Sequence, residues 1–126
     1  MEEIKAKRYI LVVDDDPDVL YATKKFLDKN GFKTQIAING REALDYVCME
    51  TPPDLIVLDM QMTEMDGYTF MNKLNTMNLR KMIPVIVISA YSEMEGIMLL
   101  KGIKTYLVKP AKPEDLLEKV NEVLFG

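Results

Sequence analysis

Five short runs of apolar residues are spaced along the chain and predict five β-strands. They lie at Tyr9–Val13, Thr34–Ile38, Leu55–Leu58, Val85–Ile88 and Thr105–Val108. Four of these runs are nearly continuous in aliphatic or aromatic residues, which is typical of strands buried on both faces of a parallel sheet. The run TQIAI at 34–38 is more polar, so we expect that strand at an edge of the sheet.

Segments of helical length separate the strands, and several of them begin with a capping signal. Asp16 precedes a proline, which favours an N-cap followed by proline in the first helical turn. Asn39 and Ser92 each stand three residues before a glutamate, the spacing of a capping box. Pro113 is followed by two acidic residues, which suit the positive end of a helix dipole.

Strands that alternate with helices predict an α/β fold with right-handed crossovers. We expect a single doubly wound, five-stranded parallel sheet with helices on both faces. One domain accounts for residues 1–126, with its core at about 8–125. A chain of 126 residues buries enough surface to fold without a metal or a disulfide.

Composition excludes several classes of function. The lone cysteine, Cys48, excludes an internal disulfide, and the absence of histidine excludes a Ser-His-Asp triad, a His-ligated metal and a phosphohistidine carrier. A net charge of −4 argues against direct binding to nucleic acid. No apolar run approaches the length of about 18 residues that a membrane span needs. We therefore expect a cytoplasmic protein without membrane contact.

Polar side chains of distinct chemistry follow four of the five predicted strands. Asp14 and Asp15 follow the first, Asp59 the third, Ser89 the fourth and Lys109 the fifth. Each residue alone is more often a turn, cap or surface residue. Ligands of open parallel sheets bind at the carboxyl ends of the strands, so the combination predicts a binding site there.

The expected site suits a divalent cation and a phosphoryl group. Two carboxylates at ~4 Å repel by about 4 kcal/mol at an effective dielectric constant near 20, and a hard cation relieves this repulsion. A site with only a few protein oxygens suits Mg²⁺, which retains several of its waters, and Mn²⁺ is the alternative ion. A cation, a lysine and a hydroxyl beside Asp59 would bind phosphoryl oxygens and leave this carboxylate as the nucleophile.

Four motifs together resemble the receiver domain of bacterial two-component response regulators, over essentially the whole chain. They are VVDDDP at 12–17, LDMQM at 58–62, ISA at 88–90 and YLVKP at 106–110, and a further MDG stands at 65–67. Each is weak alone, whereas all four in this order and spacing are specific. The resemblance implies a flavodoxin-like sheet with strand order 2-1-3-4-5.

The resemblance also implies the phosphoacceptor and the metal ligands. Asp59 would receive a phosphoryl group from the phosphohistidine of a sensor histidine kinase or phosphotransfer protein, or from a small acyl phosphate. Asp15, Asp59 and the backbone carbonyl of Gln61 would bind Mg²⁺ directly, and Asp14 would act through water.

Further residues are assigned to the switch by the same resemblance. Ser89 would hydrogen-bond a phosphoryl oxygen, and Lys109 would pair with Asp59 and then with the phosphoryl group. The bond before Pro110 would be cis, which is accessible to X-Pro bonds. Tyr106 would turn inward as Ser89 moves.

Two other positions of the resemblance concern the lifetime of the phosphoryl group. Gln61 and Tyr91 stand two residues beyond Asp59 and Ser89, and their bulk predicts slow self-dephosphorylation. The chain departs from the usual family pattern at Thr63 and Glu64, where proline and glycine are common, so we expect a differently shaped loop there.

The fourth helix is the other atypical stretch. Met94, Met98, Leu99 and Leu100 stand in or near it. For most of them, the spacing favours a core stripe over a partner surface.

The leading hypothesis is a phospho-activated switch that catalyses only its own phosphoryl transfer and dephosphorylation. We expect no output domain within the chain, so output would pass to a partner protein or to a fused domain elsewhere. The surface made by the fourth helix, the fifth strand and the fifth helix would contact this partner. A phosphorylation-dependent homodimer through the same surface is an alternative form of output.

Two alternatives come from other classes of protein. A constitutive scaffold with this fold conflicts with the complete set of acidic residues. A flavin mononucleotide carrier conflicts with the three aspartates at 14–16, where a phosphate would need small residues and backbone amides.

Overall fold

The chain forms five β-strands that alternate with helices. The computed structural model describes residues 8–60, 64–77, 83–100 and 102–126. In chain order the elements are β1 Tyr9–Val13, α2 Pro17–Lys29, β2 Lys33–Ala37, α3 Gly40–Val47, β3 Leu55–Met60, α4 Glu64–Thr76, β4 Val85–Ser89, the 3₁₀ turn η2 Ser92–Met94, α5 Glu95–Leu100, β5 Thr105–Val108 and α6 Pro113–Phe125.

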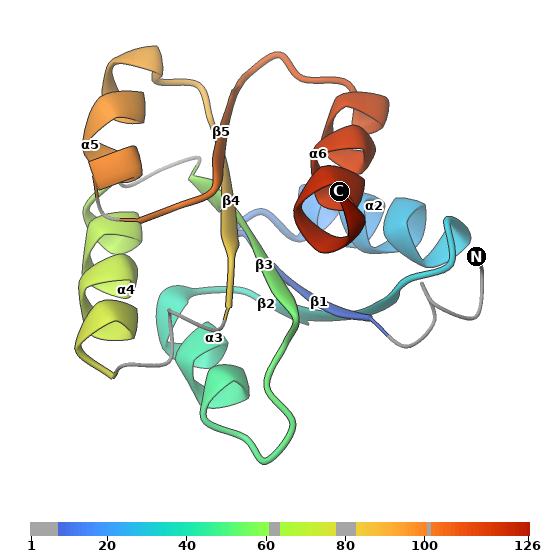
Figure 1. Cartoon of the computed structure of the whole chain (residues 1–126), viewed down its shortest axis with the longest axis horizontal. Coiled ribbons are helices and arrows are strands. Elements are labelled where there is room, and N and C mark those ends of the chain that lie inside the picture. Colours follow the sequence, from blue (N-terminus) through green and yellow to red (C-terminus); the bar gives the residue numbers. More distant parts are fainter. Residues whose placement is uncertain (1–7, 61–63, 78–82, 101) are drawn as a thin grey trace.

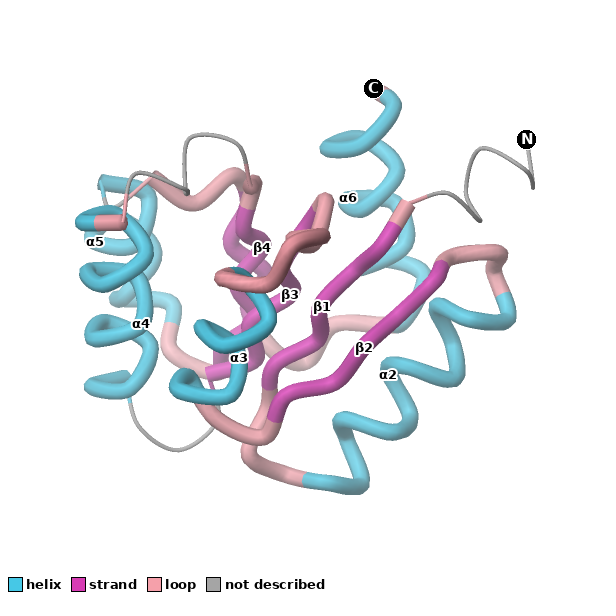
Figure 2. The backbone as a smooth tube through the Cα atoms, turned by 90° about the horizontal axis from the view of Figure 1, so that it is seen from below, coloured by secondary structure: helices cyan, strands magenta, loops and turns pink. Residues whose placement is uncertain are grey.

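The five strands form one parallel sheet in the order β2-β1-β3-β4-β5. The strand order and the edge position of the more polar β2 are therefore as the sequence and the resemblance predict. Helices α3, α4 and α5 cover one face of the sheet, and α2 and α6 cover the other (Figures 1 and 2). The predicted doubly wound architecture is confirmed.

Alternate residues of each central strand enter two separate cores. On β1, Leu11 and Val13 pack into a core with side chains of α3, α4 and α5, whereas Ile10 and Val12 pack into a core with α2 and α6. Because both faces are covered, both sets of side chains must be apolar. This explains why the central strands are read from the sequence as unbroken apolar runs.

Three predicted helix starts are confirmed and one is wrong. α6 begins at Pro113, with Glu114 and Asp115 in its first turn. The side chains of Asp16 and Asn39 accept hydrogen bonds from backbone N–H groups in the first turns of α2 and α3. Ser92, by contrast, begins the 3₁₀ turn η2, for which Tyr91 is the cap residue without a side-chain hydrogen bond. The short turn replaces the first turn of the expected helix, so no capping box forms there.

The strand limits differ slightly from the prediction. β2 runs over 33–37 rather than 34–38, and β3 and β4 extend far enough to include Asp59 and Ser89. These two residues are therefore held by the sheet ladder itself. Thr63 lies outside the described residues, so the expectation for the loop after Asp59 stays a prediction.

The expectation of a core stripe along the fourth helix is wrong for two of its residues. Met98 is fully buried, but Leu99 is 45% exposed and Leu100 is 90% exposed. α5 has only six residues, and each residue advances about 100° around the axis, so Leu99 and Leu100 turn away from the sheet.

Within the described part of the chain, no helix has the length and apolar character to cross a membrane.

Candidate functional site

The carboxyl end of the sheet brings two buried aspartates together. Val13 of β1 is paired with Leu58 of β3, so Asp14 and Asp59 occupy the next position on neighbouring strands. Asp14 is 2% exposed and the side chain of Asp59 is 8% exposed. The N–H group of Asp14 donates to the carbonyl of Ala37 at 3.1 Å, so the end of β1 is tied to β2.

Burial raises the pKa of both carboxyl groups. The pKa of Asp14 rises to about 7, first because the group is buried and further because the Asp59 carboxylate lies beside it. Burial also raises the pKa of Asp59, an effect that Lys109 opposes. Oδ1 of Asp14 accepts a hydrogen bond from the N–H group of Asp16, whereas its buried Oδ2 has no hydrogen-bond partner among the described residues. This end of the sheet is thus short of positive charge.

Lys109 supplies the positive charge nearest to Asp59. Its Nζ lies 2.8 Å from Oδ1 of Asp59. The Lys109–Pro110 peptide bond is cis, and the N–H group of Lys109 donates to the carbonyl of Ser89 at 2.7 Å. One ammonium group balances only one of the two neighbouring carboxylates.

Ser89, Tyr91 and Tyr106 form a chain of contacts next to this ion pair. Ser89 is completely buried, and its Oγ accepts a hydrogen bond from the N–H group of Tyr91 at 3.0 Å. The hydroxyl of Tyr106 donates to the carbonyl of Tyr91, and the Tyr106 ring is buried in the core that includes α5. The loop after β4 is therefore held through both the N–H group and the carbonyl group of Tyr91. The Tyr106 ring already points inward while Ser89 contacts Tyr91, so the expectation that it turns inward only as Ser89 moves is wrong.

The residues that would hold a metal ion are brought together only in part. Asp14 and Asp59 are adjacent, and the charge of the exposed Asp15 contributes to the raised pKa of Asp59. No three acidic or thiol side chains converge on one point in the part of the chain that the structure describes. Gln61 lies outside the described residues.

This donor set fits Mg²⁺ nevertheless. The Asp59 carboxylate is the kind of hard oxygen ligand that this ion prefers, and the buried Asp14 oxygen without a hydrogen-bond partner among the described residues can accept from a water that the ion retains. Mg²⁺ binds through few carboxylates and retains several waters, so a complete protein cage is unnecessary.

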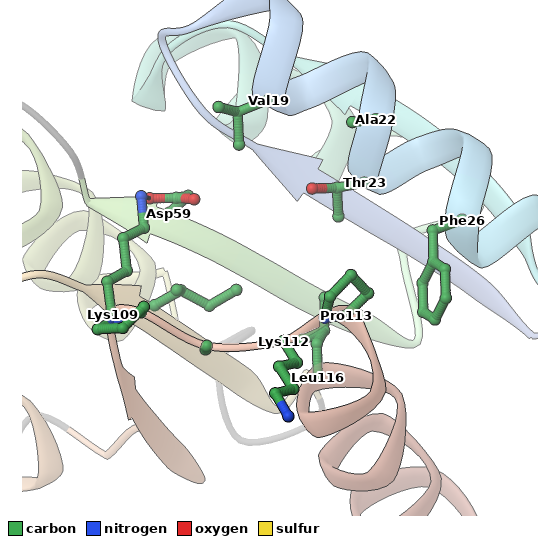
Figure 3. Close-up of a pocket in the computed structure, with 12 residues that line it drawn as sticks. Val19, Ala22, Thr23, Phe26, Asp59, Lys109, Lys112, Pro113 and Leu116 are labelled. Carbon is green, nitrogen blue, oxygen red and sulfur yellow. Dashed lines mark ion pairs between the residues drawn. The ribbon is translucent and has the colours of Figure 1, made fainter.

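A pocket of about 550 Å³ beside Asp59 was missed by sequence reasoning (Figure 3). It lies between α2 and α6, and the α2 side contributes Val19, Ala22, Thr23 and Phe26. Their spacing of 0, 3, 4 and 7 residues was the available signal, because it places all four on one side of a helix.

Comparison with known proteins decides the family. The family described as response regulator receiver domain matches residues 10–121. The chain belongs to this family. As a receiver domain it is a component of two-component signal transduction, and the resemblance expected from the four motifs is confirmed.

Relatives of this receiver domain include proteins of about its own length and longer ones. The transcriptional regulatory protein PrrA of Mycobacterium leprae is 40% identical over 117 residues, which are 91% of this chain and 49% of PrrA. The chain thus spans about half the length of that regulator. Sporulation initiation phosphotransferase F of Bacillus subtilis is 33% identical over 117 residues, and the match covers 92% of that protein.

Solved structures of other receivers superpose closely. The response regulator TrrA of Thermotoga maritima, in complex with Mg²⁺–BeF, has a TM-score of 0.80 and 30% identity, over 93% of this chain and 99% of TrrA. A CheY-like receiver domain protein of Methanospirillum hungatei also has a TM-score of 0.80, with 32% identity over 91% of both chains. The flavodoxin-like, CheY-like fold is therefore confirmed.

Proposed function

We propose that this receiver domain is a phosphorylation-activated switch in which Asp59 accepts the phosphoryl group. The observation that carries the proposal is the buried Asp59 carboxylate, ion-paired to Lys109 at 2.8 Å and adjacent to Asp14. The donor is the phosphohistidine of a sensor histidine kinase or phosphotransfer protein, or a small acyl phosphate. The relative named as a phosphotransferase supports phosphoryl chemistry of this kind.

In the transfer, one oxygen of Asp59 attacks the phosphorus atom. The new O–P bond forms while the bond between phosphorus and the donor nitrogen, or the donor acyl oxygen, breaks, and the donor keeps that electron pair. Lys109 then pairs with the phosphoryl oxygens, and the hydroxyl of Ser89 donates a hydrogen bond to one of them. The domain catalyses only its own phosphorylation and dephosphorylation.

Mg²⁺ is the proposed cofactor, with Mn²⁺ as a substitute. Asp15, Asp59 and the carbonyl of Gln61 would hold it, with Asp14 acting through water, and the TrrA complex with Mg²⁺–BeF supports this ion. When bound, the ion supplies positive charge that offsets the carboxylates and the phosphoryl oxygens. Burial, and after it the neighbouring Asp59 carboxylate, raise the pKa of Asp14, and this cost of holding buried negative charge is the physical reason for needing the ion.

The switch follows from the new charge at Asp59. A phosphoryl group adds about −1.5 to −2 charge, and Ser89 must reorient to donate to it. Its Oγ now accepts from Tyr91, so this movement changes the position of the Tyr91 loop and of the Tyr106 contact. The surface formed by α5, β5 and α6 changes with them, and it offers the exposed Leu100 to an output partner or to a second copy.

A phosphorylation assay tests the assignment of Asp59. Incubation with acetyl phosphate and Mg²⁺ should add one phosphoryl mass to the wild type and none to Asp59→Asn, whereas Asp45→Asn, at an exposed position on α3, should behave as wild type. Uptake by Asp59→Asn at the same stoichiometry would refute the proposal. Mg²⁺ alone should also raise the melting temperature, because it binds only the folded chain, whereas a constitutive scaffold should show no change.

A cytoplasmic location is part of the same proposal. The lone cysteine fits a reducing compartment. A receiver must also meet the phosphohistidine of its kinase on the side of the membrane where ATP is available. Fractionation of cells should therefore recover the protein with the cytosolic fraction.

A further inference from the structure

The pocket between α2 and α6 has the size and character of a small-molecule site. Its volume of about 550 Å³ lies within the range of roughly 300–1,000 Å³ that is usual for ligand pockets. Figure 3 shows that the pocket extends from Asp59 and Lys109 along the space between the two helices. It lies on the face of the sheet that α2 and α6 cover, opposite to the face that α5 covers.

Most side chains that line the pocket are apolar. Val19, Ala22 and Phe26 line it from α2, and Pro113 and Leu116 line it from α6. A pocket with such walls favours the apolar body of a ligand, because apolar surface is removed from water on binding.

The charged groups of the pocket lie at two places. Asp59 and Lys109 form their ion pair at one end, and Lys112 lies away from them near Leu116 (Figure 3). The Lys112 ammonium makes no ion pair with the described residues. The nearby carboxylate of Asp115 instead accepts a hydrogen bond from the backbone N–H group of Lys112. Two lysines and one aspartate give the lining a net charge of +1.

We propose that this pocket binds a small amphipathic monoanion, with an apolar body between the two helices and a carboxylate paired with Lys112. The single excess positive charge matches one negative charge on the ligand, and the apolar walls match an aliphatic or aromatic body. Lys109 is not the partner of the ligand, because Asp59 already occupies it. The site adjoins the phosphoryl site and shares Asp59 and Lys109 with it at one end, but its test measures binding without any phosphorylation.

Octanoate is the probe, and acetate and 1-octanol are its controls. Titration of the whole chain, followed by NMR amide shifts and calorimetry, should show saturable binding of octanoate at α2 and α6. Acetate lacks the apolar body and 1-octanol lacks the charge, so both should bind more weakly than octanoate.

Two variants separate the contributions of charge and shape. Lys112→Gln should weaken octanoate by about two- to fivefold, as expected for an exposed ion pair, and should leave 1-octanol unchanged. Lys104→Gln, an exposed lysine outside the pocket, is the matched control. Ala22→Phe fills part of the pocket from the exposed side of α2 and should weaken both ligands about tenfold or more.

Three results would overturn the proposal. They are an absence of amide shifts at α2 and α6 at millimolar octanoate, equal affinity for 1-octanol and octanoate, or equal weakening by Lys112→Gln and Lys104→Gln. Because Lys112 is exposed, its replacement tests the proposal even if Ala22→Phe reduces stability.

Discussion

The hydroxyl group of Tyr106 on β5 donates a hydrogen bond to the backbone carbonyl of Tyr91 in the loop after β4. The N–H group of Tyr91 donates in turn to Oγ of Ser89 at 3.0 Å. Tyr91 thus connects, through its backbone, the two residues that we expect to move together in the switch. Any reorientation of Ser89 breaks or lengthens a contact to this loop.

Replacement of Tyr106 by phenylalanine should loosen the loop without emptying the core. One hydrogen bond is lost while the ring stays, so we expect the free energy of unfolding to fall by about 1 kcal/mol. Amide hydrogen exchange in residues 90–94 should become faster. Tyr21→Phe, at an exposed position of α2, is the control, and unchanged exchange in Tyr106→Phe would show that the contact does not hold the loop.

Replacement of Lys109 by glutamine should destabilise the protein and impair phosphorylation. Asp59 would lose its ion pair, and because the pair is largely buried we expect a loss of about 1–3 kcal/mol at neutral pH. Thermal melts without and with Mg²⁺ should show that the ion restores part of this loss. Lys104→Gln should melt like the wild type, and a Lys109→Gln protein of wild-type stability and phosphorylation rate would contradict the assignment.

Asp14 should make stability depend on pH when Mg²⁺ is absent. Its pKa is raised from 3.8 to about 7 in the folded state, so the fold favours the protonated carboxyl group. The stability due to this protonation is present below about pH 4 and is lost as the pH rises through about 7. Asp14→Asn does not titrate, so at pH 8 it should be more stable than the wild type by on the order of 1 kcal/mol or more.

The difference between Asp14→Asn and the wild type should become small at about pH 4, where Asp14 of the wild type is protonated in the folded chain and partly protonated in the unfolded chain. Denaturant unfolding at the two pH values measures it. Asp45→Asn, at an exposed position, should show no such trend. An equal difference between Asp14→Asn and the wild type at both pH values would mean that Asp14 is ionised in the fold throughout.

Tyr91 should lengthen the life of the phosphorylated state. It follows Ser89 by two residues and is half-buried, so its side chain can limit the access of water to the acyl phosphate. Loss of phosphate, followed by mass spectrometry after removal of acetyl phosphate, should be faster in Tyr91→Ala. Faster loss in the wild type would reverse this interpretation.

Local sequence signals predicted which helices and strands form more accurately than the residues at which they begin and end. Caps at Asp16 and Asn39 formed as predicted because a side chain and a backbone N–H group two or three residues away need no tertiary partner. Ser92 failed as a cap because the loop from Ser89 to Tyr91 is held by contacts from β5, which a local pattern does not contain.

The sequence by itself determined the doubly wound sheet and the sheet edge at which its polar residues collect, because apolar periodicity and strand ends are local properties. Only the tertiary structure decided how deeply Asp14 and Asp59 are buried, and that α2 and α6 leave a pocket beside them. Distances between carboxylates, and the fit of one helix against another, depend on how distant segments pack, and neither propensity nor spacing along the chain records that.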